Sequence, residues 1–184
     1  MKTTLFAAAA ALFAGCSSMS PMAPMLYSQD ALPDAVKVPA GFKVALETVG
    51  VGEISYECRS KAAVAGEFEW VFVSPKAVLN DRGGKAVGKV VGKYYGPPAT
   101  WEAMDGSKIT ATQLAVAPAG AGNIPFQLVK ANAAMGSGMM SGVSHIQRVA
   151  TRGGTAPALP CAAASVGSKQ VVGYQADYIF WKAV

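Results

Sequence analysis

Residues 54–59 alternate apolar and polar side chains with a period of two, the pattern of a strand that buries one face of a sheet. Ile54, Tyr56 and Cys58 fall on one side of this segment, and polar side chains fall on the other. A helix repeats every 3.6 residues and would spread the same apolar side chains around its surface. The pattern therefore predicts a strand whose inner face includes Cys58.

Residues 67–73 repeat the alternation, and Pro75 is expected to end that strand because proline cannot donate a hydrogen bond to a neighbouring strand. The side chains predicted to point inward here are Phe68, Trp70 and Phe72. Further strands are expected over residues 86–95, 100–102, 108–116, 126–131, 143–151 and 174–181.

The N-terminus is typical of an export signal of the bacterial lipoprotein type. A single lysine precedes an apolar run from Leu5 to Gly15, which is too short to span a bilayer but suits a signal peptide. Small residues then lead to Cys16, where such chains are cleaved and acylated with fatty acids such as palmitate. The alternative is an ordinary signal cleaved nearby, in which Cys16 has no role.

This interpretation places the protein outside the cytoplasm, anchored to a lipid bilayer through acylated Cys16. Ser17 follows the cysteine instead of an aspartate, which favours the outer membrane facing the periplasm. A soluble periplasmic or secreted protein is the alternative. The predicted organisation is a signal peptide at 1–15, a lipidated flexible tether at 16–36 and an all-β domain at 37–184.

Cys58 and Cys161 form an even pair of thiols in an exported chain. An oxidising compartment favours a disulfide between them, which would close a loop of roughly 100 residues. Their spacing alone is also compatible with two buried thiols, a metal pair or a redox couple. Neither CxxC spacing nor clustered histidines accompany them, so the sequence does not indicate a metal site.

Twenty glycines and eleven prolines punctuate the chain, and almost none of the sequence follows a helical period. Short strands with turn signals about every 8–12 residues are typical of sandwiches and small barrels. The predicted fold is a single antiparallel β-sandwich with long loops rich in glycine and proline and one disulfide. A small β-barrel is the alternative.

The formal net charge of +5 comes from scattered lysines, none of them adjacent to another. Such a distribution lacks the clustering that nucleic acid requires, so no nucleic-acid partner is expected. The sequence contains no GxGxxG, Walker loop, HExxH or calcium-loop pattern, and we therefore expect no cofactor and no metal. Nothing in the sequence indicates an oligomeric state.

The richest cluster of aromatic and acidic side chains combines two tyrosines, a tryptophan and two carboxylates. The predicted ligand-binding residues are Tyr94, Tyr95, Trp101 and Glu102. Aromatic faces stack on sugars or peptides, and a carboxylate accepts their hydrogen bonds. Glu102 and Asp105 are also candidates for the paired acids of a hydrolase. The structural alternative places Trp101 in the core, Glu102 in solvent and Asp105 in a turn.

His145, the single histidine, lies on a predicted strand and is the third candidate catalytic residue. It would need a nucleophile and an orienting acid nearby. No GxSxG elbow or comparable motif is present, and the alternation places Ile146 rather than His145 toward the core. A hydrogen-bonded or surface histidine is the favoured interpretation.

Short motifs also recur in order from Val38 to Trp181 and mark a resemblance to a known family. They are Val38-Pro39-Ala40-Gly41, Tyr56-Glu57-Cys58, Trp70-Val71-Phe72, Thr100-Trp101-Glu102-Ala103 with Asp105-Gly106-Ser107-Lys108, Ile124-Pro125-Phe126, Ile146-Gln147-Arg148-Val149 with Gly153-Gly154 and Ala156-Pro157, Cys161, and Tyr174 with Ala176-Asp177-Tyr178. In these motifs the chain resembles the domain-of-unknown-function family 3455, found in exported bacterial proteins and in fungi. The resemblance supports Cys58 and Cys161 as disulfide partners and implies no established activity.

The leading functional prediction is an exported lipoprotein that binds a ligand or partner of the cell envelope, whether glycan, peptide or protein. A binding module is favoured over an enzyme because no catalytic motif is present. The alternatives are an envelope hydrolase that uses Glu102, Asp105 or His145, and a structural lipoprotein without a ligand.

Overall fold

The computed structural model describes residues 27–83 and 88–184, so the predicted signal peptide and Cys16 lie outside the described residues. Apart from two short 3-10 turns, Asp34–Val36 and Ala163–Ser165, the regular structure is entirely β. None of the helices in these residues has the length and apolar content that crossing a membrane requires.

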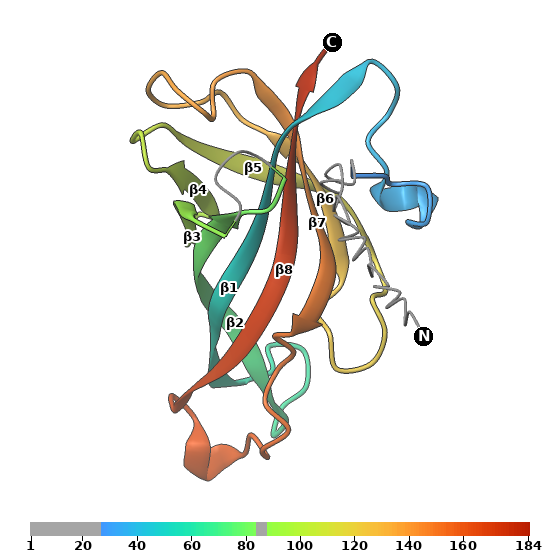
Figure 1. Cartoon of the computed structure of the whole chain (residues 1–184). Coiled ribbons are helices and arrows are strands. Elements are labelled where there is room, and N and C mark those ends of the chain that lie inside the picture. Colours follow the sequence, from blue (N-terminus) through green and yellow to red (C-terminus); the bar gives the residue numbers. More distant parts are fainter. Residues whose placement is uncertain (1–26, 84–87) are drawn as a thin grey trace, which may run out of the picture.

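Eight antiparallel strands form one sheet in which each strand pairs with the next along the chain, and β8 also pairs with β1 (Figure 1). The strands are β1 (Phe42–Ser60), β2 (Phe68–Asp81), β3 (Val90–Tyr95), β4 (Thr100–Ala103), β5 (Lys108–Ala117), β6 (Phe126–Ala131), β7 (Val143–Gly153) and β8 (Lys169–Ala183). The predicted all-β class is confirmed. The sheet closes into a barrel, the predicted alternative to the sandwich, because the long β1 and β8 pair and join the first strand to the last.

β1, β2 and β8 extend past the other strands at one end of the barrel, which is drawn at the bottom of Figure 1. We define this as the lower end. It carries the β1–β2, β3–β4, β5–β6 and β7–β8 loops, residues 61–67, 96–99, 118–125 and 154–168. The upper end carries the β4–β5 and β6–β7 loops and the C-terminus.

β2 continues through Pro75, and the prediction that proline ends this strand is therefore wrong. Pro75 pairs with Ile54 beside a β-bulge, the kind of site where a strand tolerates proline. The bulge adds one residue to β2 and reverses its alternation of inner and outer side chains. As a result Phe72 and Leu79 lie on the same inner face although they are an odd number of positions apart. Leu79 is buried in the core, whereas Phe72 pairs with interior Tyr56, as the inward prediction requires, but is 51% exposed at the lower end of the barrel.

Alternate side chains of the strands fill the barrel interior. Those of β8 are Tyr174, Ala176, Tyr178 and Phe180, which are all buried, as the sequence pattern predicts. Gly50 of β1 lies against the ring of Tyr178, and a Cβ built there would be 2.5 Å from that ring. The glycine is therefore required by the close approach of this large side chain to the neighbouring strand.

The outer face of β6, β7 and β8 is covered by residues 27–38, which we define as the N-terminal strap. Val36 and Val38 of the strap are buried together with Ile179 and Trp181 of β8. The strap includes the last part of the segment expected to be a flexible tether. In that part the chain packs on the sheet instead of standing away from it.

Gln147 of β7 anchors the strap, and its side chain is fully buried. Its amide nitrogen donates to the Val36 carbonyl at 2.7 Å and to the Gln29 side chain at 3.0 Å. Its amide oxygen accepts from the Tyr27 hydroxyl at 3.1 Å and from the Trp181 indole at 2.9 Å. Every polar atom of this buried amide is thus paired.

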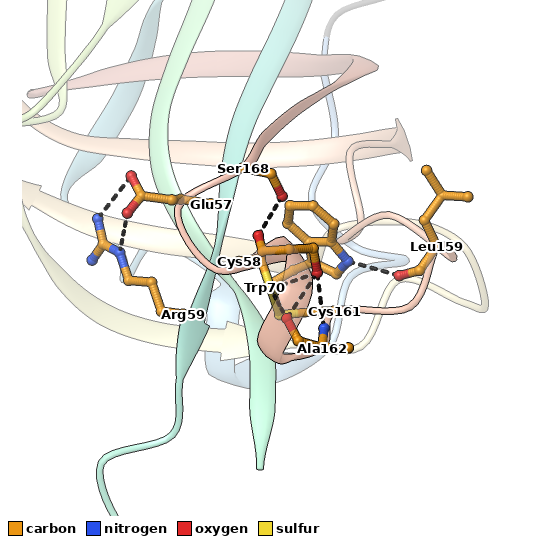
Figure 2. Close-up of a disulfide and its surroundings, with 9 residues drawn as sticks. Glu57, Cys58, Arg59, Trp70, Leu159, Cys161, Ala162 and Ser168 are labelled. Atoms are coloured by element: carbon orange, nitrogen blue, oxygen red, sulfur yellow. Dashed lines mark hydrogen bonds and ion pairs between the residues drawn. A yellow bond between two sulfur atoms is a disulfide. The ribbon is translucent and has the colours of Figure 1, made fainter. Parts of the chain in front are cut away.

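The lower end is held by the disulfide between Cys58 of β1 and Cys161 of the β7–β8 loop (Figure 2). The loop is fixed further where the indole of Trp70 donates to the Leu159 carbonyl at 2.7 Å and the Cys58 amide donates to the Ser168 carbonyl at 3.0 Å. The bridge joins residues 103 positions apart, and a constraint on so long a loop is worth up to about 4.7 kcal/mol in the chain-entropy account. The predicted disulfide is confirmed.

Replacing Gln147 with leucine keeps the size of the side chain but leaves the Val36 carbonyl and the Trp181 indole without a partner. A buried unpaired polar group costs about 1–3 kcal/mol, so we expect the free energy of unfolding to fall by roughly 2–5 kcal/mol in urea denaturation. Gln175→Leu on β8 is the control, because the half-buried Gln175 makes no side-chain hydrogen bond within the described chain. Equal losses in the two variants would contradict the anchoring role.

Candidate functional site

The structure does not bring the three candidate catalytic residues together. Glu102 lies on the outer face of β4, Asp105 in the β4–β5 turn and His145 on β7. β5 and β6 separate β4 from β7, and at about 4.8 Å per strand this places His145 roughly 14 Å from Glu102 along the sheet. Paired carboxylates of a hydrolase lie within about 9.5 Å of each other and share one site. The geometry gives no support to a catalytic group built from these residues.

Asp105 is committed to the turn. Its carboxylate accepts hydrogen bonds from the Ser107 hydroxyl at 2.6 Å and amide at 2.9 Å, and from the Met139 amide at 2.7 Å. The Ser107 hydroxyl, followed by the Met139 amide, holds the pKa of Asp105 below its usual value. The residue therefore ties the β4–β5 turn to the β6–β7 loop, in agreement with the structural alternative.

His145 packs in an apolar setting. Its ring meets the edge of Phe42 with the ring centres 4.5 Å apart, and its Nδ1 lies 3.2 Å from the Ser144 hydroxyl. Burial, followed by the charge of Lys130, lowers the pKa of the imidazole. Within residues 27–83 and 88–184, no carboxylate orients this ring, and no group of three His, Cys, Asp or Glu side chains could hold a metal ion.

The predicted ligand-binding residues separate onto the two faces of the sheet. Trp101 and Tyr94 lie in the barrel interior, where their rings stack with centres 4.6 Å apart. Trp101 is 2% exposed and also meets the edge of Tyr178. Tyr95 and Glu102 alternate with these two side chains and lie on the outer face.

Tyr95 and Glu102 form the centre of a charged network on that outer face. The Tyr95 hydroxyl donates to Glu102 at 2.7 Å, and the ammonium groups of Lys93 and Lys108 lie 3.2 Å and 3.7 Å from the same carboxylate. The hydrogen bond from Tyr95, followed by the contact with Lys93, lowers the pKa of Glu102. Glu102 is therefore ionised at neutral pH and fully occupied by these partners.

Beside this network the outer face is hollowed. A hollow of about 610 Å³ lies over β1, β2 and β3, and a second of about 410 Å³ adjoins it over β2, β3 and β4. We define the two together as the outer groove. Its lining residues are Val51, Gly52, Glu53, Lys76, Ala77, Val78, Val90, Gly92, Lys93, Tyr94, Tyr95, Glu102, Ala103, Met104 and Gly106.

Aliphatic side chains in the outer groove are exposed to solvent, whereas those on the outer face of β6–β8 are covered by the strap. Val51 and Val78 are cross-strand partners, and each is nearly half exposed. Val90 and Met104, with Met104 71% exposed, continue the apolar surface into the second hollow. This face of the barrel is thus apolar and open, whereas the face of β6–β8 is apolar and covered.

Sequence reasoning missed Val51, Val78 and Lys76, which line the groove. In β1 the apolar Val51 lies between Gly50 and Gly52, so no alternation with large inner side chains marks it as outward-facing. The signal that could have found the two valines is that Val51 and Val78 are apolar, since a strand with one solvated face carries polar side chains at its outward positions.

Replacing Tyr95 with phenylalanine removes the strongest stabilising contact of the Glu102 carboxylate, so the pKa of Glu102 should rise toward its ordinary value. Lys108→Gln removes a more distant charge and should raise it less. Carboxyl-detected NMR titration measures both shifts, with Glu57, held by Arg59, as an internal reference. The pKa of Glu102 is lower in the folded chain than in the unfolded chain, so the network stabilises the fold at pH values above the ordinary pKa of a glutamate. This stabilisation is lost as the pH falls through the lower pKa of the folded state. A larger shift in Lys108→Gln would contradict this order of causes.

Comparison with known proteins agrees with the resemblance seen in the sequence motifs. No curated protein and no solved structure matches the chain. Residues 39–182, which include all of β1–β7 and all but the last residue of β8, match a family described as Protein of unknown function (DUF3455). The chain belongs to this family.

Proposed function

We propose that this protein is an exported, lipid-anchored binding module of the cell envelope, held at the outer membrane by acylated Cys16. In this proposal the outer groove binds an apolar segment of a protein partner. The observation that carries it is the open apolar face of β1–β4, with Val51, Val78, Val90 and Met104 exposed around two adjoining hollows. Contiguous exposed apolar surface rimmed by polar side chains is typical of interaction sites.

The charges beside the groove favour a partner that carries a carboxylate next to its apolar side chains. Lys76 lines the groove and makes no ion pair within the part of the chain that the structure describes. Lys93 lies between Val78 and Glu102 in the cross-strand register, so the positive groups flank the valines. Opposite charges at the rim orient a partner and raise the rate of association more than they raise affinity.

A protein segment suits the groove better than a glycan. Sugars are held chiefly by open aromatic faces. Among the described residues that line the groove, the ring of Tyr94 lies in the barrel interior, and the ring of Tyr95 has the Lys93 ammonium 5.4 Å from its centre. The floor consists instead of branched aliphatic side chains, which fit apolar residues of a protein.

The strap supports the proposed attachment to the membrane. Residues 16–26 lie between Cys16 and the strap, and eleven residues span at most about 40 Å when fully extended. The strap covers β6–β8, so the groove over β1–β4 remains available when the domain is held near the bilayer.

A photo-crosslinking amino acid at position 78, introduced into the full-length protein in the cells that produce it, tests the proposal. We expect a discrete protein adduct from position 78 and none from position 112 on β5, where Thr112 is also exposed. Lys76→Gln, which removes the charge without placing a second carboxylate opposite Glu53, should weaken the adduct with little change in the melting temperature, because a surface charge contributes little to stability. Identical adducts from both positions, no adduct at all, or a heterogeneous product degraded by glycan-cleaving enzymes would overturn the proposed protein partner.

A further inference from the structure

We propose that the lower half of the barrel interior is a second binding site, which takes a small molecule carrying a carboxylate or phosphate group. Arg148 provides the positive charge, and Gln113, Gln127 and Tyr94 provide hydrogen-bonding groups around it. This site lies on the opposite face of the sheet from the outer groove and does not depend on the function proposed there.

The register of β7 places Arg148 on the inner face. Ile146 belongs to the interior core and Gln147 contacts the strap outside, so Arg148 follows on the inside. Its cross-strand neighbours are Tyr178 of β8, an interior residue, and Gln127 of β6. Arg148 is therefore a half-buried cation on an inner face that is otherwise largely apolar.

The positive charge of Arg148 is not neutralised by a carboxylate anywhere in residues 27–83 and 88–184. Its Nε and Nη2 donate to a single acceptor, the Pro125 carbonyl, at 3.2 Å and 3.0 Å. A guanidinium carries five N–H donors, so these two bonds leave three donors for a ligand. Arginine with free, forked donors is the side chain best suited to carboxylate and phosphate.

Two glutamines continue the polar surface from Arg148 across β6 and β5. The Gln127 amide donates to the Gln113 side chain at 2.6 Å, and both residues share the inner-face parity of the core residues Val129 and Ile109. Gln113 is exposed, which shows that solvent reaches this part of the inner face. A small molecule can therefore reach the same side chains from solvent.

The strand pairing explains why the barrel is accessible here. β4 has only four residues and pairs with β5 at Lys108, Ile109 and Thr110. Along the rest of its length, Ala111–Ala117, β5 pairs with β6 alone among the described strands. This stretch of β5 thus has a neighbouring strand on one side only, and Gln113 lies within it.

The aromatic side chains next to this polar surface also retain unused hydrogen-bonding groups. The Tyr94 hydroxyl makes no hydrogen bond, and the buried Trp101 indole N–H has no acceptor, within the residues that the structure describes. By contrast, Tyr56 donates to the Gly154 carbonyl at 2.7 Å and Tyr174 pairs with Tyr178 at 3.1 Å. Burial raises the pKa of Tyr94, so its phenol remains protonated and can donate to an anion at neutral pH.

The probes are two separate anions that each contain a phenyl ring, phenyl phosphate and benzoate. Neutral benzamide is the control for charge. The protein is the full mature chain with Cys16→Ala, followed by amide NMR during titration. We expect saturable shifts at Gln127 and Arg148 with at least one anion, and roughly tenfold or greater weakening in Arg148→Gln, as for loss of a charged hydrogen bond. Comparing the two anions shows whether carboxylate or phosphate is preferred.

Arg152→Gln on the same strand is the matched control, because Arg152 is exposed and should bind neither probe. Arg148→Lys keeps the charge without the forked donors and should bind with intermediate affinity, which keeps the test valid if Arg148→Gln fails to fold. Equal weakening in Arg148→Gln and Arg152→Gln, equal affinity for benzamide, or no saturable shift with either anion would overturn the inference.

Discussion

The pairing of β1 with β8 is the constraint on which the rest of the structure depends. It runs from Phe42 opposite Ala183 to Glu57 opposite Lys169 and joins the first and last strands of the sheet. Thr48 reinforces the seam, because its buried hydroxyl donates to the Tyr178 carbonyl at 3.2 Å. Since closure removes the edges of the sheet at this seam, every strand acquires one inner and one outer face.

The closed sheet divides its side chains among three environments with different roles. The interior holds the aromatic core and, in its lower half, the polar group around Arg148. The outer face of β6–β8 is buried beneath the strap through Gln147, and the outer face of β1–β4 stays open as the groove. In the proposed function, stability, attachment and recognition therefore reside on separate surfaces, and a substitution on one surface need not disturb the others.

Apart from the Cys58–Cys161 disulfide, the sequence predicted local features well and long-range ones poorly. The inner face of β8 around Tyr178 follows from alternation alone, and the turn at Asp105 follows from its Asp-Gly pair. The bulge beside Pro75 arises from cross-strand pairing, which no local pattern specifies. The same holds for the candidate site: alternation separates Trp101 from Glu102, but the strands between Glu102 and His145 become apparent only when the pairing order is known.

Amide hydrogen exchange measured by NMR tests the closure of the barrel most directly. Closure predicts that the seam amides, residues 46–54 of β1 and 172–180 of β8, exchange only through global unfolding and are among the slowest in the protein. The amides of β5 near Leu114, with a partner strand on one side, should exchange faster. Seam amides that exchange faster than those of β5 and β6 would show an open sheet and contradict the account.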